Sequence, residues 1–251
     1  YEAAQTLYEE ALAMLRQLLG PEHKEVAIAL INVALVLHDK GDYEAAGANY
    51  REALRMQEAL LGPSHPDARA TRNNLAWLYY DQGKRAEAIS LLRETLELAR
   101  TVDPHHPDVG AIATNLASWL TQEGLYDEAR ALLSEALEIR QRAFGESHPQ
   151  VAGTVSVKAD LLVAVKEFAE ARETAHRART MLAESLPENH WRVAAAESAE
   201  GAALTGLGDY AEAEVLLLKS NDVLRKGGPA TTSLSQLSRE RLDHLYAVWK
   251  R

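Results

Sequence analysis

The chain has 251 residues and 47% apolar content, enough to bury a substantial core. Its 37 acidic and 27 basic residues leave a formal net charge of −10, so we expect neither nucleic acid nor an anionic membrane surface as a partner. The chain has no cysteine, which excludes disulfides, thiolate nucleophiles and cysteine-based metal sites and is consistent with a cytoplasmic protein. The longest apolar run, residues 26–37, is too short to cross a bilayer.

Residues 1–19 predict one helix that has no preceding partner. The opening Tyr-Glu-Ala-Ala of residues 1–4 recurs as residues 43–46, where it begins the second helix of a later repeat. We therefore expect residues 1–19 to be the second helix of an incomplete repeat. We also expect the chain to be a piece of a longer protein, so that any catalytic activity would lie in the remaining sequence.

Five repeats follow, marked by three sets of landmarks. Histidines recur at intervals of 42, 41, 42 and 42 residues, at His23, His65, His106, His148 and His190. Eighteen residues after each histidine stand Gly41, Gly83, Gly124, Lys166 and Gly208. Five residues further on stand Ala46, Ala88, Ala129, Ala171 and Ala213. A fixed period of this length is typical of a solenoid, and it predicts repeats over 20–61, 62–102, 103–144, 145–186 and 187–228.

Each repeat predicts a pair of helices, and residues 62–102 show why. Pro66 suits a first helical position and His65 before it is a candidate cap, whereas Gly83 ends the first helix. A second helix then begins, and the small Ala76 and Ala88 are expected where the two helices cross closely. One histidine per repeat is too widely spaced to share a metal ion, so we interpret the histidines as caps and expect no metal and no cofactor.

Residues 229–251 predict a terminal capping helix. Gly227-Gly228-Pro229 is the strongest helix breaker in the chain, and helical spacing of leucines resumes over residues 231–249. The other side of this helix is rich in serine, arginine and glutamate, so it can cap the stack or receive a further helix. With one unpaired helix, five pairs and this one, we expect about twelve helices.

The repeated phrases resemble a known family. Asn-Leu-Ala, then Gly-x-Tyr-x-x-Ala, then Gly-x-x-His-Pro is similar to the 42-residue tetratricopeptide (TPR) repeat of kinesin light chains. The resemblance implies an all-α, right-handed superhelical solenoid of antiparallel helix pairs, a single array over residues 1–251. In this family the first helices line a concave groove that binds peptides or protein segments. Repeats four and five depart from the pattern at Val157, Lys166, Trp191 and Ala199, so we expect them to contribute less to polar recognition.

The resemblance also implies which residues face the groove. We call the residues at one position of successive repeats a column. One column holds Asn32, Asn74 and Asn115, and neighbouring columns hold Asn73, Trp77, Tyr80, Asp81, Ser118 and Asp160. An asparagine carries a donor and an acceptor, so a row of them can pair with the backbone of an extended peptide. The alternative is that each asparagine ties its own repeat to the next through a buried hydrogen bond.

We interpret the chain as a non-catalytic scaffold that binds a protein or peptide in the groove of repeats one to three. One alternative is a regulatory or sensor segment of a larger bacterial kinase or ATP-dependent regulator. Another is homo-association through the open ends of the array, with the first helix stacked on the terminal one. An enzyme, such as a helical phosphatase, would have to use Asp81, Asn115 and Asp160, the set of groove residues suited to it.

Overall fold

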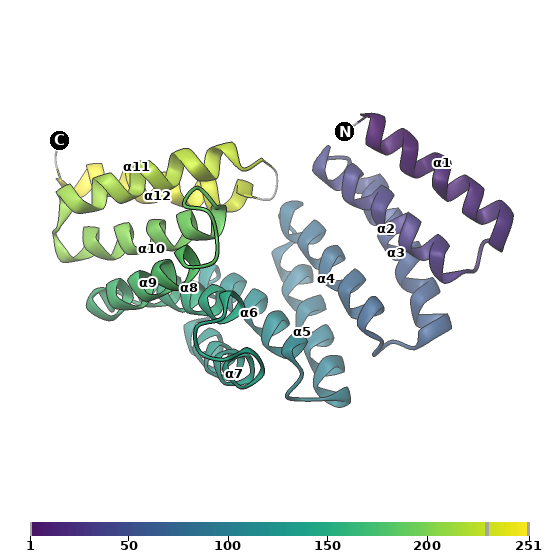
Figure 1. Ribbon diagram of the computed structural model, residues 1–251, viewed down its shortest axis with the longest axis horizontal. Helices are drawn as coiled ribbons and strands as arrows, with labels where there is room; N and C mark the ends of the chain where they lie inside the picture. The colour runs from purple at the N-terminus through teal and green to yellow at the C-terminus, as the bar shows by residue number, and fades with distance from the viewer. Residues whose placement is uncertain (1, 229–230, 250–251) are drawn as a thin grey trace. The chain divides into compact units, whose positions relative to one another are not determined.

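A computed structural model describes residues 2–228 and 231–249, and within them the regular secondary structure consists of twelve α-helices (Figure 1). Residues 1, 229–230 and 250–251 of the predicted first and last helices lie outside the described residues. The helices are α1 (Glu2–Leu19), α2 (Lys24–Asp39), α3 (Tyr43–Leu61), α4 (Pro66–Asp81), α5 (Arg85–Val102), α6 (Pro107–Gln122), α7 (Tyr126–Phe144), α8 (Pro149–Ala164), α9 (Phe168–Ala183), α10 (Trp191–Leu207), α11 (Tyr210–Lys226) and α12 (Thr232–Trp249). The predicted all-α stack of antiparallel helix pairs is confirmed.

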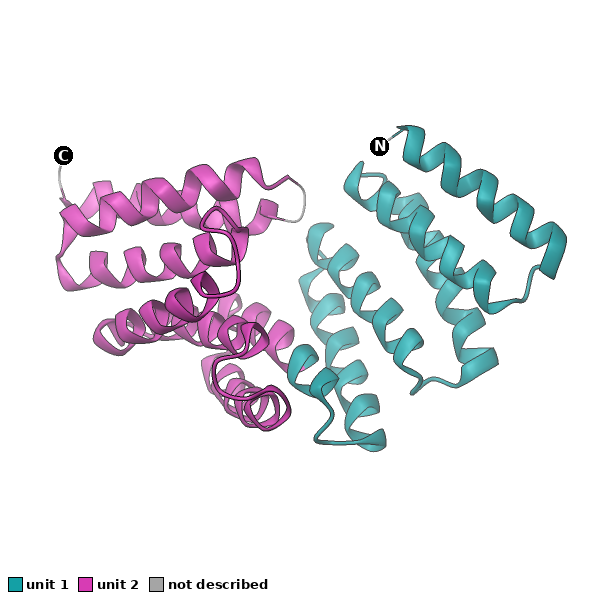
Figure 2. Cartoon of the chain, in the orientation of Figure 1, with its two compact units in different colours: residues 1–112 teal, residues 113–251 magenta. Residues whose placement is uncertain are grey.

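The helices fall into two compact units, residues 1–112 and 113–251, with the boundary inside α6 (Figure 2). In unit 1, α1 packs on α2, and the pairs α2–α3 and α4–α5 follow. In unit 2, α7 packs on α8, the pairs α8–α9 and α10–α11 follow, and α12 packs on both α10 and α11. The first helices α8 and α10 also contact each other. The single array over residues 1–251 stays a prediction.

The recurring histidines cap the first helices. In each repeat the imidazole Nδ1 accepts a hydrogen bond from the backbone N–H two residues later, at 3.1–3.2 Å. A free N–H at a helix start has no partner inside the helix, so the imidazole takes the place of the missing carbonyl. The five hydrogen bonds confirm the capping interpretation. Ala76 and Ala88 are fully buried, as the close crossing of α4 and α5 requires.

The turns between the paired helices need a left-handed residue, and four of the five repeats supply glycine. The φ angles of Gly41, Gly83, Gly124 and Gly208 lie between 76° and 88°. Lys166 takes this place in repeat four with φ at 64°. Its Cβ makes this conformation unfavourable, since an L-residue there approaches the following carbonyl oxygen. The turn is therefore kept although the glycine is lost, and Lys166 carries the strain.

Replacing Lys166 by glycine should raise the free energy of unfolding by about 0.5–1 kcal/mol. The gain is the relief of left-handed strain, about 1–2 kcal/mol, less the greater backbone entropy of glycine in the unfolded chain. Urea denaturation followed by circular dichroism measures the change. Lys166→Ala is the control, because it removes the same side chain and keeps the Cβ. Equal stabilisation by alanine and glycine would show that the lysine side chain, not the backbone, is the source of strain.

Candidate functional site

In unit 1 five of the six residues predicted for the groove lie on α4 between its middle and its carboxyl end, and the sixth, Asn32, lies on α2. The ring centroids of Trp77 and Tyr80 lie 6.2 Å apart in an edge-to-face arrangement, with Trp77 half-buried and Tyr80 buried. The guanidinium of Arg85 lies 5.6 Å from the Tyr80 ring centroid. Edge-to-face contact and a cation above the ring both fix the orientation of Tyr80. Trp77 and Tyr80 therefore form an aromatic cluster through direct contact of their side chains.

Asp81 is joined to the neighbouring first helix. The Nε2 atom of His38 on α2 lies 2.8 Å from Oδ2 of Asp81, and the His38 ring meets Tyr43 edge-on with centroids 5.7 Å apart. The interaction ties α2 to α4 next to the aromatic cluster. Reasoning from the sequence missed His38, although counting 42 residues back from Tyr80 reaches it.

The asparagines of unit 1 are partly open to a ligand. Asn32 and Asn74 are half-buried, and neither side chain has a hydrogen-bond partner within the part of the chain that the structure describes. Asn73 is also half-buried but has an interaction partner, and the same holds for Asn115 of unit 2. Two of the four amides are thus free to donate and accept, as contact with a peptide backbone requires.

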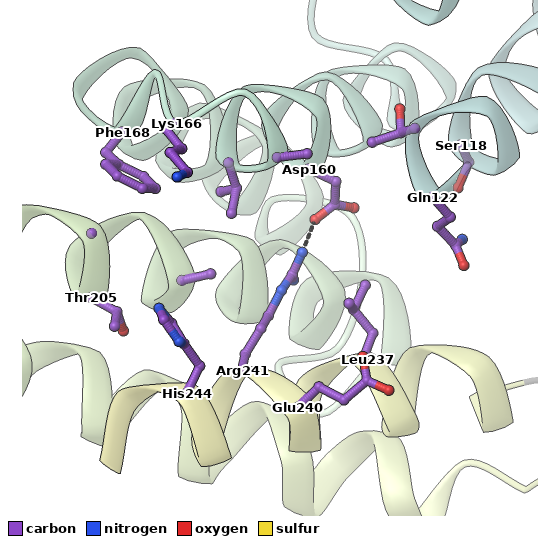
Figure 3. A pocket seen from close by; sticks show the side chains of 15 residues that line it. Ser118, Gln122, Asp160, Lys166, Phe168, Thr205, Leu237, Glu240, Arg241 and His244 are labelled. Carbon is purple, nitrogen blue, oxygen red and sulfur yellow. Dashed lines mark hydrogen bonds and ion pairs between the residues drawn. The ribbon is translucent and has the colours of Figure 1, made fainter. Parts of the chain in front are cut away.

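Unit 2 contains a pocket of about 400 Å³ between α6, α8, α10 and α12 (Figure 3). Two of the predicted groove residues, Ser118 on α6 and Asp160 on α8, line it together. Helix α10 supplies Ala202, Thr205 and Gly206, and helix α12 supplies four further residues. The pocket was not predicted from the sequence.

Asp160 holds the terminal helix in place beside this pocket. Its Oδ1 accepts a hydrogen bond from Nη2 of Arg241 at 2.6 Å, and Nη1 of Arg241 donates to Oγ of Ser198 at 3.1 Å. Asp81 and Asp160, two of the three residues that an enzymatic role would need, are therefore both engaged by side chains of the chain itself.

The repeat register explains which residues reach the pocket. The column that holds Trp77 continues as Ser118, Asp160, Ala202 and His244, and all four of these later members line the pocket. Counting 42 residues from Ala199 reaches Arg241, so this arginine stands in the asparagine column. The terminal helix lacks the histidine and glycine landmarks, so the sequence does not mark it as a further repeat.

Among the described residues, no three histidine, aspartate or glutamate side chains gather as a metal ion would require. Across residues 2–228 and 231–249, no helix combines the length and the apolar character needed to span a membrane.

Comparison with known proteins gives one family and several similar folds. A family model described as a tetratricopeptide repeat matches residues 1–56, 25–101 and 108–184, whereas no curated protein matches the chain. The solved structure of BtubC (BKLC) from P. vanneervenii is 22% identical, with a TM-score of 0.74 over 88% of this chain and 90% of that one. A candidate kinesin light chain of Podosopora anserina, with nearly identical TPR-like repeats, is 23% identical, with a TM-score of 0.62 over 81% and 97%. Yeast Tom70 is 18% identical, with a TM-score of 0.58 over 95% of this chain and 43% of Tom70.

Proposed function

Because this chain belongs to the tetratricopeptide repeat family, we propose that it is a non-catalytic scaffold that binds a protein or an extended peptide segment. The repeats are typical of protein–protein interaction. The observation that supports a binding surface in unit 1 is the Trp77–Tyr80 contact, together with the free amides of Asn32 and Asn74. The proposed surface is the face of α2 and α4 that carries these four residues and Asp81.

The chemistry of this face suits an extended segment. Tryptophan and tyrosine with polar neighbours are among the side chains that contribute most to protein interfaces. An asparagine amide can donate to a backbone carbonyl and accept from a backbone N–H, whatever the sequence of the ligand. The half-buried Trp77, held by its contact with the buried Tyr80, would therefore provide affinity, and the asparagines would fix the direction of the bound segment.

Substituting Trp77 by alanine should weaken peptide binding by about tenfold and leave the fold intact, since loss of an interface aromatic removes buried area and packing. A peptide can be selected on the wild-type protein from a random display library, and its Kd then measured by fluorescence polarisation for each variant. Trp191→Ala is the matched control, because Trp191 is a partly exposed tryptophan at the start of α10, in unit 2. Unchanged peptide affinity of Trp77→Ala, with a lowered melting temperature, would show that Trp77 only packs between helices.

Homo-association through the two ends receives uneven support from the structure. Helix α1 exposes Leu7, Met14 and Leu18 by 57–79%, whereas Met56, the counterpart of Met14 one repeat later, is fully buried. The outward positions of α12 are mostly polar instead, with Gln236, Arg239 and Asp243 exposed beside the apolar Val248. A polar helix face does not complement an apolar one, so stacking α1 of one copy on α12 of another is disfavoured.

A further inference from the structure

The pocket of unit 2 has the size and lining of a small-molecule site. Its volume of about 400 Å³ lies in the range of such sites, which are mostly apolar with a few polar groups in fixed places. The apolar surface comes from Val163, Ala164, Phe168, Ala202 and Leu237, which belong to α8, α9, α10 and α12. All of the residues that line the pocket belong to unit 2.

The space exists because small residues replace large ones in two columns. The Trp77 column carries serine at 118 and alanine at 202, and the Asp81 column carries alanine at 164 and glycine at 206. Gly206 allows the ring of Phe168 to lie directly against α10, where a Cβ at position 206 would overlap the ring. Phe168 is thereby held as a fixed aromatic wall of the pocket.

The two cationic side chains that line the pocket, Arg241 and Lys166, differ in whether they are free to pair with a ligand. Arg241 is already neutralised by Asp160 and hydrogen-bonded to Ser198. Lys166 is the other lining cation, and within residues 2–228 and 231–249 its ammonium has no ion-pair partner. In Figure 3 Lys166 lies next to Phe168 on one side of the pocket, with Arg241 and His244 on the other. Glu240, the second lining carboxylate, belongs to α12 on that opposite side.

Lys166 is also the strained residue of the fold. It alone of the described non-glycine residues has a positive φ, in a turn where the other repeats have glycine. Strain of this kind persists where the surroundings hold it and is concentrated at functional sites. Glycine would serve better than lysine if the position had only to form a stable turn. A role at the charged edge of the pocket therefore explains the lysine better than a role in the turn does.

We propose that this pocket binds a small amphipathic anion, an aromatic or branched aliphatic group that carries a carboxylate. The apolar group would lie against Phe168 and Ala202, and the carboxylate would pair with the ammonium of Lys166. Lys166 is exposed, so a charge-assisted hydrogen bond to it should favour an anion over a cation of the same shape by a modest factor. None of the residues that line this pocket belongs to α2 or α4, which carry the proposed peptide surface.

The test is calorimetric titration of the whole chain with 2-naphthylacetate and with 2-naphthylethylamine, a cation of similar shape. The wild-type protein should bind the acid about fivefold more tightly than the amine, and Lys166→Gly should weaken binding of the acid about fivefold. Lys166→Gly is predicted to be at least as stable as the wild type, so loss of binding cannot be ascribed to unfolding. Lys158→Met, which removes a lysine of α8 that does not line the pocket, should bind the acid normally.

Two further variants separate this site from others. Ala202→Phe should abolish binding of both compounds by filling the pocket, with circular dichroism to show that the fold remains. Trp77→Ala should leave binding of the acid unchanged, since Trp77 does not line the pocket. Equal affinity for acid and amine, no effect of Lys166→Gly, or no binding of the acid at millimolar concentration would each overturn the proposal.

Discussion

Replacing Lys219 by alanine should lower the free energy of unfolding by about 2–3 kcal/mol, because it leaves the carboxylate of Glu197 buried without a cation. Glu197 lies on α10 with 2% of its surface exposed. Nζ of Lys219 on α11 donates to Oε1 of Glu197 at 2.9 Å and to Oε1 of Glu188 at 2.8 Å. The other oxygen of Glu197 has no hydrogen-bond partner among the described residues. Lys219 is 38% exposed, so water can partly replace it and the loss falls below the full value for a dry ion pair.

Urea denaturation of three variants separates this explanation from simple loss of a surface charge. Lys226→Ala is the matched control, since Lys226 pairs with the exposed Asp222 and its removal should change stability by less than about 1 kcal/mol. The double variant Lys219→Ala, Glu197→Gln should recover most of the loss, because a neutral amide is far less unfavourable to bury than a charge. If the double variant were as unstable as Lys219→Ala, the buried charge would not be the cause.

The effect should depend on pH in a defined direction. The pKa of Lys219 is raised by its hydrogen bond to Glu188 and then by that to Glu197, and the pKa of Glu188 is lowered by Lys219. A lysine whose pKa is raised by folding contributes stability that is complete below the pKa of the unfolded state. That stability is lost as the pH rises through the pKa of the folded state. A glutamate whose pKa is lowered by folding contributes stability above the pKa of the unfolded state, and that stability is lost as the pH falls through the pKa of the folded state. The advantage of the wild type over Lys219→Ala should therefore be largest between about pH 5 and pH 10 and shrink on either side.

The sequence predicts the helices of this protein well because each is marked by local chemistry. Pro66 after a capping histidine gives the start of α4, and Gly83 after its last residue gives the turn. The last helix, predicted over residues 231–249, begins one residue later at Thr232. Such signals act over a few residues, so they can be recognised without any knowledge of the tertiary structure.

Of the two candidate sites, the one built from residues close in the sequence could be predicted, and the one built from distant residues could not. Trp77 and Tyr80 are three residues apart on one helix, so their contact follows from helical geometry alone. The pocket of unit 2 depends on Arg241 reaching Asp160, 81 residues earlier in the chain, and on the absence of a side chain at Gly206. The loss of glycine at position 166 suggests a degenerate repeat, whereas the structure shows a lysine in the same left-handed turn at the edge of a pocket.

Changing Gly201 to leucine should destabilise the protein by about 3 kcal/mol, because α10 and α11 approach too closely to admit a larger side chain. Gly201 stands in the column that carries alanine in repeats one to four. A Cβ placed there would lie 2.7 Å from Cγ and 3.0 Å from Cδ2 of Leu217, and 3.4 Å from the carbonyl oxygen of Ala213. Leu217 is fully buried, so it has no free space into which to move.

Alanine substitutions at two helical glycines isolate this steric effect from helix propensity, with thermal denaturation as the measurement. A Cβ at Gly153 on α8 meets no atom within 4 Å, so Gly153→Ala should stabilise the chain by about 0.5–1 kcal/mol through propensity alone. Gly201→Ala gains the same propensity but overpacks against Leu217, which should outweigh the gain and leave a net loss of about 1 kcal/mol. Stabilisation of similar size at both positions would mean that α10 and α11 can separate at little cost, and Gly201 would then be an accidental departure from the alanine column.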